Sequence, residues 1–389
     1  MGPLQGVKII ELAGIGPVPL CGMMLSDMGA EVIRVDRAVG AIGGISVERP
    51  YDVLGRGRKS IRVNLKDPEG VEVVYRLLET ADALIEGFRP GVTERMGLGP
   101  DAVLARCPRI VYGRMTGWGQ DGPIAHIAGH DINYIALAGS LSAIGNKGGK
   151  PVPPLNLVGD FGGGGMFLFG GVLCGIIEAM KSGKGQVVDA AMVDGAAVLT
   201  AAIYGFREQG LWDDERGNNF ADGGAPFYDT YECADGKYIS LGSIEPQFYA
   251  QLMQLGGFDA EDPVFKQQFN KANWPRSKAL MTERFLTKTR DQWCEIMQQS
   301  DICFAPVLGM DEAPDHPHNI ERNLFVEVDG WKQPAPAPRF NRTVQEIQGP
   351  TPIMGADTRQ VMLEAGYSDD EVSRLIATNA VAAALRKSA

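Results

Sequence analysis

Hydrophobic and polar positions alternate between strand-like and helix-like segments through the first 210 residues. Short β-branched apolar runs predict strands, and apolar residues at helical spacing lie between them. The predicted strands cover residues 7–12, 31–36, 83–86, 110–115 and 186–192, and the predicted helices cover residues 17–28, 70–80, 100–107, 166–180 and 194–209. Because parallel strands need crossover connections, this order predicts a Rossmann-like, doubly wound α/β domain.

The pattern changes after residue 210. Residues 211–224 are polar and rich in turn formers, and they predict a linker. A hairpin around Asp235-Gly236 and three helical patterns follow, so we expect a smaller α+β domain over residues 225–330. We expect the C-terminal segment 331–389 to complete the large domain of residues 1–210. Within it, prolines predict an extended linker over residues 332–340 and acidic residues predict a helix that starts near Ser368.

Composition and net charge indicate which classes of binding partner are disfavoured. The net charge of −11 and the pI of about 5.0 disfavour binding to nucleic acid or to an anionic membrane. The six cysteines are scattered singly, without spacing for zinc, which predicts reduced thiols and no metal. The longest apolar run, residues 166–180, falls short of the ~18 residues of a membrane helix and predicts a buried helix instead.

Two features near the N-terminus bear on anion binding. Gly14, Gly16 and Asp36 resemble a dinucleotide fingerprint, but Pro19 occupies the third glycine position and disfavours NAD or FAD. Basic residues are concentrated before residue 115, at Arg34, Arg37, Arg49, Arg56, Arg58, Lys59, Arg62, Lys66, Arg89 and Arg95. This concentration predicts either a site for a ligand with several negative charges or simply a solvated face.

Two short stretches contain candidate catalytic residues. The first is Gly129-His130-Asp131-Ile132-Asn133-Tyr134, and the second runs from Pro151 through Asn156-Leu157-Val158-Gly159-Asp160 into the glycine run 162–165. Both lie next to predicted helices, whose N-termini favour a developing negative charge. His126 lies outside these stretches, and we expect it either at the surface or in support of the site residues without contact to the substrate. We expect His316 and His318, in a proline-rich loop, at the surface.

The chain resembles the α-methylacyl-CoA racemases, within the family III CoA-transferase superfamily. The resemblance covers nearly the whole chain, including Gly55-Arg56-Gly57-Arg58-Lys59-Ser60, Arg89-Pro90-Gly91-Val92, Met115-Thr116-Gly117-Trp118-Gly119-Gln120 and Gly185-Gln186-Val187-Val188-Asp189. The two stretches around His130 and Asp160 are the specific part, because the transferases lack that histidine. One departure is Asn64, where the family usually has aspartate.

The resemblance implies the site residues. His130 and Asp160 would be acid and base on opposite faces of the substrate's α-carbon, and Glu245 would orient His130. The coenzyme A site implied by the resemblance comprises Arg37, Val63, Asn64, Leu65, Lys66, Arg89, Arg95, Gly129, Asp131, Ile132, Asn133 and Tyr134. It also implies the family III CoA-transferase fold and an interlocked homodimer, so Glu245 would serve either its own site or that of its partner.

The residue types agree with an acid–base reaction. Removal of a thioester α-proton needs a positioned base, and inversion needs a second group on the other face. Histidine titrates near neutrality, and Asp160 would need a desolvated pocket that raises its pKa. The implied substrate is an acyl-CoA thioester, with coenzyme A part of the substrate and no further cofactor. The sequence leaves the acyl group open among branched fatty acyl, steroid side-chain and arylpropionyl thioesters.

Two alternatives remain at this stage. A CoA-transferase would use Asp160 as a nucleophile and would not need His130. A CoA-binding protein without catalysis would have no reason to carry His130, Asp160 and Glu245 together. We expect a bacterial cytoplasmic enzyme, because the first residues do not have the pattern of a signal peptide and the last, Arg386-Lys387-Ser388-Ala389, do not match a peroxisomal targeting signal.

Overall fold

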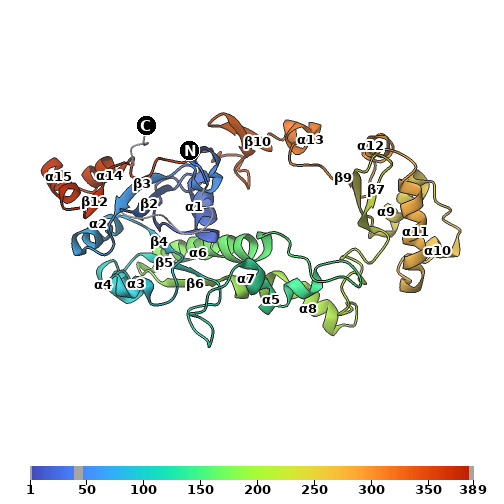
Figure 1. Ribbon diagram of the computed structural model, residues 1–389, viewed down its shortest axis with the longest axis horizontal. Coiled ribbons are helices and arrows are strands. Elements are labelled where there is room, and N and C mark those ends of the chain that lie inside the picture. The colour runs from blue at the N-terminus through green and yellow to red at the C-terminus, as the bar shows by residue number, and fades with distance from the viewer. Residues whose placement is uncertain (1, 39–46, 385–389) are drawn as a thin grey trace. The chain divides into compact units, whose positions relative to one another are not determined.

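The computed structural model of the protein describes residues 2–38 and 47–384, so the basic C-terminal end lies outside the described residues. The chain divides into two compact units. We call Met1–Ala138, Leu155–Leu199 and Asn323–Ala389 the large unit, and Gly139–Pro154 and Thr200–Arg322 the small unit. The C-terminal segment therefore returns to the large unit, where Figure 1 shows α14, α15 and β12 beside β2 and β3.

A seven-stranded sheet forms the centre of the large unit. Its strands are β1 (Lys8–Leu12), β2 (Glu31–Arg37), β3 (Lys59–Val63), β4 (Ala83–Glu86), β5 (Val111–Thr116), β6 (Val187–Ala191) and β12 (Val381–Ala382). The order is β12-β3-β2-β1-β4-β5-β6, and all neighbours are parallel except β12, which pairs antiparallel with β3. This is the doubly wound order, with the direction of winding reversed between β1 and β4. The predicted fold class is therefore confirmed, although β3 and β12 were not predicted.

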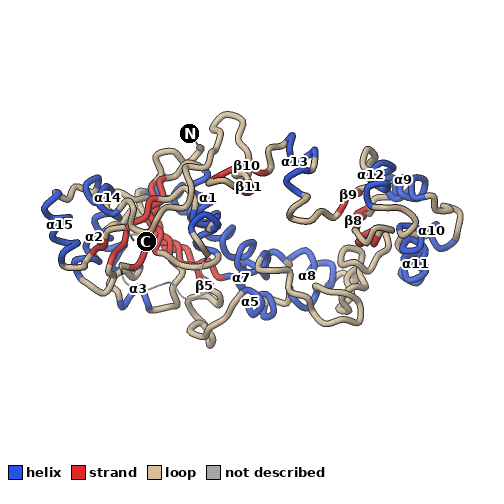
Figure 2. The backbone as a smooth tube through the Cα atoms, turned by 45° about the horizontal axis from the view of Figure 1, so that its top comes forward, coloured by secondary structure: helices blue, strands red, loops and turns tan. Residues whose placement is uncertain are grey.

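Helices cover both faces of this sheet (Figure 2). The helical segments of the large unit are η1 (Arg49–Tyr51), η2 (Val53–Gly55), α1 (Pro17–Asp27), α2 (Pro68–Leu78), α3 (Val92–Arg95), α4 (Pro100–Arg106), α5 (Asp131–Leu137), the π-helix η4 (Leu157–Gly165), α6 (Met166–Ser182), α7 (Met192–Leu199), α14 (Thr358–Glu364) and α15 (Asp369–Ala377). Adjacent residues of β1 show how the two layers arise. Ile10 belongs to the core that contains residues of α2, α4, α14 and α15, whereas Ile9 belongs to the core that contains residues of α1 and α6. Successive side chains of a strand point to opposite faces, so the sheet has two cores.

The glycine run at residues 162–165 lets the π-helix η4 approach its neighbours closely. A Cβ atom on Gly195 of α7 would lie 1.9 Å from the carbonyl oxygen of Gly163, and one on Gly163 would lie 2.7 Å from the backbone of Ala196. The helix continues into α6, and residues 157–182 together are long and apolar enough to cross a membrane by length and composition alone. In this structure Leu168, Val172 and Ile176 of α6 pack in the sheet core, which accounts for part of that apolar character.

The small unit has its own sheet and core. Strands β7 (Tyr228–Glu232), β8 (Tyr238–Gly242) and β9 (Phe304–Pro306) form a three-stranded antiparallel sheet. The helices of this unit are η3 (Ser140–Ala143), α8 (Ala201–Glu208), α9 (Pro246–Gly256), α10 (Pro263–Lys266), η5 (Lys271–Asn273), α11 (Trp274–Phe285), α12 (Arg290–Met297), η6 (Ala313–Asp315) and α13 (Pro317–Glu321). Its core is aromatic: Phe227, Phe285 and Trp293 are fully buried.

Three boundaries differ from those expected from the sequence. The single helix expected over residues 194–209 is two helices, α7 and α8, which meet at Thr200 and belong to different units. Residues 139–154 belong to the small unit, where Arg216 donates hydrogen bonds to the carbonyl oxygens of Ser142 (2.9 Å) and Gly149 (2.6 Å). The extended linker that was expected over residues 332–340 begins within a strand, because β11 (Trp331–Pro334) pairs antiparallel with β10 (Phe325–Val328).

Candidate active site

A cavity of about 460 Å³ opens in the large unit at the switch point of the sheet. Three of its walls are the segments 15–18, 87–90 and 115–118, which lie at the carboxyl ends of β1, β4 and β5. Open α/β sheets bind their ligands at this place, where neighbouring connections leave the sheet on opposite faces. The remaining wall contains His130 and Asp160, so the structure brings the two predicted acid–base residues to one cavity.

His130 is held by the segment that precedes α5. It is the N-cap residue of that helix, and its backbone N–H donates a hydrogen bond to Oδ1 of Asn133 (3.0 Å). The segment is fixed from behind by Tyr134, whose hydroxyl donates to the carbonyl oxygen of Gly129 and whose ring packs edge-on against Trp118 at 4.7 Å. The side chain of His130 is exposed and lines the cavity.

Asp160 is held through its backbone by the residue next to His130. The carboxylate oxygen Oδ2 of Asp131 accepts hydrogen bonds from the backbone N–H groups of Gly159 (2.6 Å) and Asp160 (2.7 Å). Asp131 is buried, and its other oxygen, Oδ1, has no partner among the described residues. Asp131 therefore links α5 to the π-helix η4, and this fixes the two candidate acid–base residues relative to one another.

Two glycines are required around Asp160. A Cβ on Gly159 would lie 2.5 Å from Oδ2 of Asp131, too close for any side chain. Gly16, the N-cap of α1, has φ 69° and ψ −115°, and a Cβ there would lie 3.4 Å from Oδ2 of Asp160. The glycine-rich turn after β1 therefore fits a close approach to Asp160 rather than to a pyrophosphate.

The environment of Asp160 disfavours its charged form. Burial raises the pKa of Asp160 above its ordinary value, and the nearby carboxylate of Asp131 adds to the rise. A hydrogen bond from Nδ2 of Asn156 (3.3 Å) and the charge of His130 act in the opposite direction on this pKa. Burial likewise raises the pKa of Tyr134 to about 12. The cavity thus holds a carboxyl group with a raised pKa near a histidine, an arrangement that suits proton transfer.

A second cavity of about 600 Å³ in the same unit is lined by two basic side chains, Lys66 and Arg95, and one acidic side chain, Asp67. It is lined by Leu65 and Lys66, which precede α2, and by Arg95 of α3. The segment 87–97 joins the two cavities, because residues 87–90 line the first and Val92, Arg95, Met96 and Gly97 line the second. Arg89 lines the first cavity.

Gly129 and Tyr134 of the predicted coenzyme A site line the first cavity, but several other predicted residues lie elsewhere. The side chain of Val63 is buried in the sheet core and unavailable to a ligand, and Asp131 is buried against the π-helix. Arg37, Asn64, Ile132 and Asn133 line neither of the two cavities. Asn64 and Asn133 instead accept hydrogen bonds from the backbone, at Lys66 (3.2 Å) and His130.

The basic residues before residue 115 do not form one site. Arg58 is fully buried in an ion pair with Glu11 (2.8 Å), and Arg56 is buried with Asp27 (2.5 Å). Lys59 pairs with carboxylates at the sheet edge. Of this group, Lys66, Arg89 and Arg95 line the two cavities, so most of the concentration stabilises the fold.

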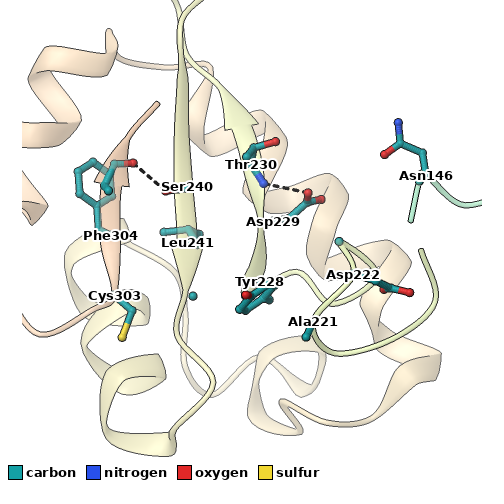
Figure 3. Close-up of a pocket in the computed structure, with 14 residues that line it drawn as sticks. Asn146, Ala221, Asp222, Tyr228, Asp229, Thr230, Ser240, Leu241, Cys303 and Phe304 are labelled. Carbon is teal, nitrogen blue, oxygen red and sulfur yellow. Dashed lines mark hydrogen bonds between the residues drawn. The ribbon is translucent and has the colours of Figure 1, made fainter. Parts of the chain in front are cut away.

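Glu245 belongs to the small unit. It is the N-cap residue of α9 and lies shortly after β8. The pKa of the Cys303 thiol is raised by the burial of Cys303 and by the negative charge of Glu245. Cys303 lines a cavity of about 550 Å³ in this unit, between the ends of β7 and β8 and the loop that contains Ala221 and Asp222 (Figure 3). One of its lining residues, Asp229, forms an ion pair with Lys278 (2.6 Å). The role of Glu245 at His130 stays a prediction.

No group of three or more His, Cys, Asp or Glu side chains that could hold a metal ion occurs within residues 2–38 and 47–384. His126 is exposed and does not line the cavity that contains His130. The positioning role of Asp131 was not found from the sequence. Its only signals were the adjacent histidine and the glycine before Asp160, which has no room for a side chain.

Fold and cavity together define a class: a doubly wound α/β protein with a histidine and an aspartate in a cavity at the switch point of its sheet. The chain belongs to CoA-transferase family III, since the model of that family matches residues 4–358. It is 44% identical to an α-methylacyl-CoA racemase of Mus musculus over 96% of each chain. It is 40% identical to the α-methylacyl-CoA racemase of Homo sapiens, over 98% of this chain and 100% of the human one. A solved CaiB/BaiF family protein from Brucella suis superposes with a TM-score of 0.79 at 25% identity, covering 94% of this chain and 99% of that chain.

Proposed function

We propose that this protein is an α-methylacyl-CoA racemase, which interconverts the (R) and (S) epimers of 2-methylacyl-CoA thioesters. The observation that carries the proposal is that His130 and Asp160 line one cavity while their backbones are tied together through Asp131. The likeness to two α-methylacyl-CoA racemases over nearly the whole chain supports it.

In the proposed reaction the two side chains exchange roles. One removes the α-proton, the electrons move into the thioester carbonyl to form an enolate, and the other returns a proton to the opposite face. The raised pKa of Asp160 supports this pairing, because a carboxyl group must be protonated part of the time to act as an acid. The thioester itself supplies the acidity, so the proposal includes no metal or redox cofactor.

We place the coenzyme A part of the substrate along the segment 87–97, which joins the two cavities, as part of this proposal. The thioester would lie in the cavity of His130 and Asp160, and the phosphates would lie near Lys66 and Arg95 in the second cavity. Arg89 would face the substrate between them. Phosphates bound by a few basic residues are compatible with the net charge of −11, because local charge governs anion binding.

We also propose a homodimer, because apolar residues remain exposed on the helices around the site. They lie on α5, α6 and α7, and comprise Ile132, Leu137, Met166, Ile177, Met180, Val198 and Leu199, each more than 40% exposed. An apolar surface of this kind on one chain is typical of a protein interface. In an interlocked dimer, Glu245 of one chain would orient His130 of the other. We propose a cytoplasmic location for this dimer.

Deuterium exchange tests the racemase directly. The protein is incubated with (S)-2-methylacyl-CoA in deuterium oxide, and the α-proton is followed by NMR. We expect deuterium incorporation and both epimers with the wild type, and a loss of about a hundredfold or more in His130→Ala and Asp160→Asn. His126→Ala is the matched control, because this exposed histidine lies outside the cavity. An α-proton that survives incubation with the wild type would refute proton transfer for this substrate.

The same enzyme preparation tests the alternative CoA-transferase. A transferase would form an acyl anhydride on Asp160, and hydroxylamine added during turnover would trap it as a hydroxamate. The racemase forms no covalent intermediate. A hydroxamate on Asp160, together with CoA transfer that survives His130→Ala, would favour the transferase.

Mixing two inactive variants tests whether Glu245 serves the partner chain. His130→Ala and Glu245→Gln homodimers are dissociated, mixed and reassociated. If Glu245 acts across the dimer, each mixed dimer contains one intact site and activity returns. If Glu245 acts within its own chain, both sites stay damaged and no activity returns. A particle that stays monomeric in light scattering would refute the dimer.

A further inference from the structure

A partly buried ion-pair bridge contacts the segment that joins the two cavities of the large unit. Glu86, the last residue of β4, is fully buried, and its Oε1 accepts a hydrogen bond from Nε of Arg114 (3.0 Å). These two residues are register partners on the parallel strands β4 and β5. Nη1 of Arg114 reaches Oε1 of Glu94 on α3 (2.9 Å). One guanidinium therefore joins the end of a central strand to the helix that carries Arg95.

The bridge contacts the segment 87–95 at both ends. Oε2 of Glu86 accepts a hydrogen bond from the backbone N–H of Phe88 (2.6 Å), one residue before Arg89. Glu94 stands one residue before Arg95. Each fixed point therefore precedes one of the two arginines that line the cavities. The residues that follow this segment are held separately, by hydrogen bonds from the hydroxyls of Tyr75 to the carbonyl oxygen of Gly97 (2.6 Å) and of Tyr112 to that of Leu98 (2.7 Å).

Arginine suits this bridge, in which Nε and Nη1 of Arg114 each reach a carboxylate. Its planar fork presents several N–H groups in fixed directions and can bind two carboxylates at once, whereas a lysine ammonium is a single point charge. Bonds of this type, between charged groups, are about twice as strong as neutral ones and are directional. A buried pair with one partner removed is destabilised, because the other charge is left without compensation.

We propose that Arg114 is a positioning residue for coenzyme A: by joining Glu86 to Glu94, it holds the segment 87–95 so that Arg89 and Arg95 face their cavities. Arg114 touches no substrate atom in this scheme. The inference rests on the proposed function, because it assumes that the two arginines bind an acyl-CoA thioester. It predicts that weakening the bridge reduces affinity for coenzyme A and leaves the proton-transfer step intact.

The test compares two arginines that each bridge two glutamates. Arg114→Lys is the test variant. Arg106→Lys is the matched control, since Arg106 pairs with Glu72 and Glu79 at the surface of the same unit. Coenzyme A alone is titrated by calorimetry, and KM and kcat come from the deuterium exchange assay. We expect Arg114→Lys to raise the Kd of coenzyme A and the KM about tenfold, with kcat within about twofold of the wild type. Arg106→Lys should leave all three unchanged.

Glu94→Gln keeps the proposal testable if Arg114→Lys does not fold. Glu94 is 43% exposed, so its amide variant retains the fold, and we expect its Kd to rise about threefold. The double variant should bind no more weakly than Arg114→Lys, because both changes break one bridge. An unchanged Kd in Glu94→Gln, a reduced kcat with unchanged Kd in Arg114→Lys, or equal effects at positions 106 and 114 would each overturn the inference. A wild type that exchanges the α-proton alongside any of these results would leave the racemase proposal standing. A wild type that exchanges the α-proton but does not bind coenzyme A overturns only the inference about Arg114.

Discussion

Replacement of Asp131 by asparagine removes a charge from the link between the two candidate acid–base residues while retaining its shape. In the native protein, Oδ2 of Asp131 accepts two backbone hydrogen bonds, from Gly159 and Asp160. A hydrogen bond to a charged group contributes about 1.5–3 kcal/mol and a neutral one about 0.5–1.5 kcal/mol. The side-chain amide that the substitution introduces would also bury a donor where Oδ1 of Asp131 has no partner among the described residues. We therefore expect Asp131→Asn to lower the free energy of unfolding by about 2–4 kcal/mol.

The same change shifts the pH dependence of catalysis. The negative charge of Asp131 raises the pKa of Asp160, so its removal lowers that pKa. Asp160 then becomes a carboxylate at lower pH. For the epimer whose proton Asp160 removes, the acidic limb of the exchange rate should therefore move to lower pH, while the maximal rate falls because Asp160 is held less firmly.

Urea unfolding measures the first effect, and α-proton exchange in deuterium oxide between about pH 5 and 9 measures the second. Asp369→Asn is a suitable control, because this carboxylate lies on the exposed first turn of α15 in the same unit. An acidic limb that stays in place, or that moves to higher pH, would refute the electrostatic link between Asp131 and Asp160.

Substitutions at Gly16, Glu86 and Gly195 test three further features of the structure. Gly16→Ala should lower stability by about 1–3 kcal/mol and also slow exchange, because its φ of 69° is strained for alanine and its Cβ would contact the carboxylate of Asp160. Gly183→Ala, with φ 73° and no atom within 4 Å, should lower stability alone, as urea unfolding and exchange rates would show. Burial raises the pKa of Glu86 from 4.5 to about 7, so this glutamate's stabilising contribution is complete below pH 4.5 and is lost as the pH rises through 7. Between about pH 4 and 8 the wild type should therefore lose stability relative to Glu86→Gln in urea unfolding, and a difference independent of pH would contradict this. Gly195→Ala should destabilise by at least about 3 kcal/mol in thermal unfolding because its Cβ collides with the π-helix, whereas Gly205→Ala, with open space around it, should be neutral or stabilising.

The sequence predicted the strands of the sheet where apolar residues dominate a segment. β1 and β4 have almost entirely buried patterns, and their bounds matched within a residue. β3 was missed because Lys59 and Arg62 fill its partly exposed positions, so that its apolar residues, Ile61 and Val63, are too few to stand out. The short edge strand β12 was missed because its pairing with β3 joins Val381 to Val63, residues far apart in the chain, which no local pattern records.

The candidate site was predictable as a set of residues but not as an arrangement. Its cavity gathers segments from residue 15 to residue 192, and only the order of the strands brings their carboxyl ends together. Residues that are neighbours in the sequence differ in burial. Asp131 and His130 are adjacent in the chain, yet the first is buried against the π-helix and the second faces the cavity.

Burial also divides the basic residues into those that form ion pairs within the fold and those that line the cavities. This division shows how a protein with a negative net charge can bind an anion. Arg56 and Arg58 lie two residues apart and are buried with Asp27 and Glu11, so their charges are compensated within the fold. Arg114 is likewise compensated by two carboxylates. A compensated arginine cannot attract phosphate strongly, but it can fix the backbone on which other arginines stand. If Arg89 and Arg95 bind coenzyme A as proposed, their affinity for it depends on neighbouring charges that never meet the ligand. A sequence-based count of basic residues records both kinds of arginine equally, and only their ion-pair partners tell them apart.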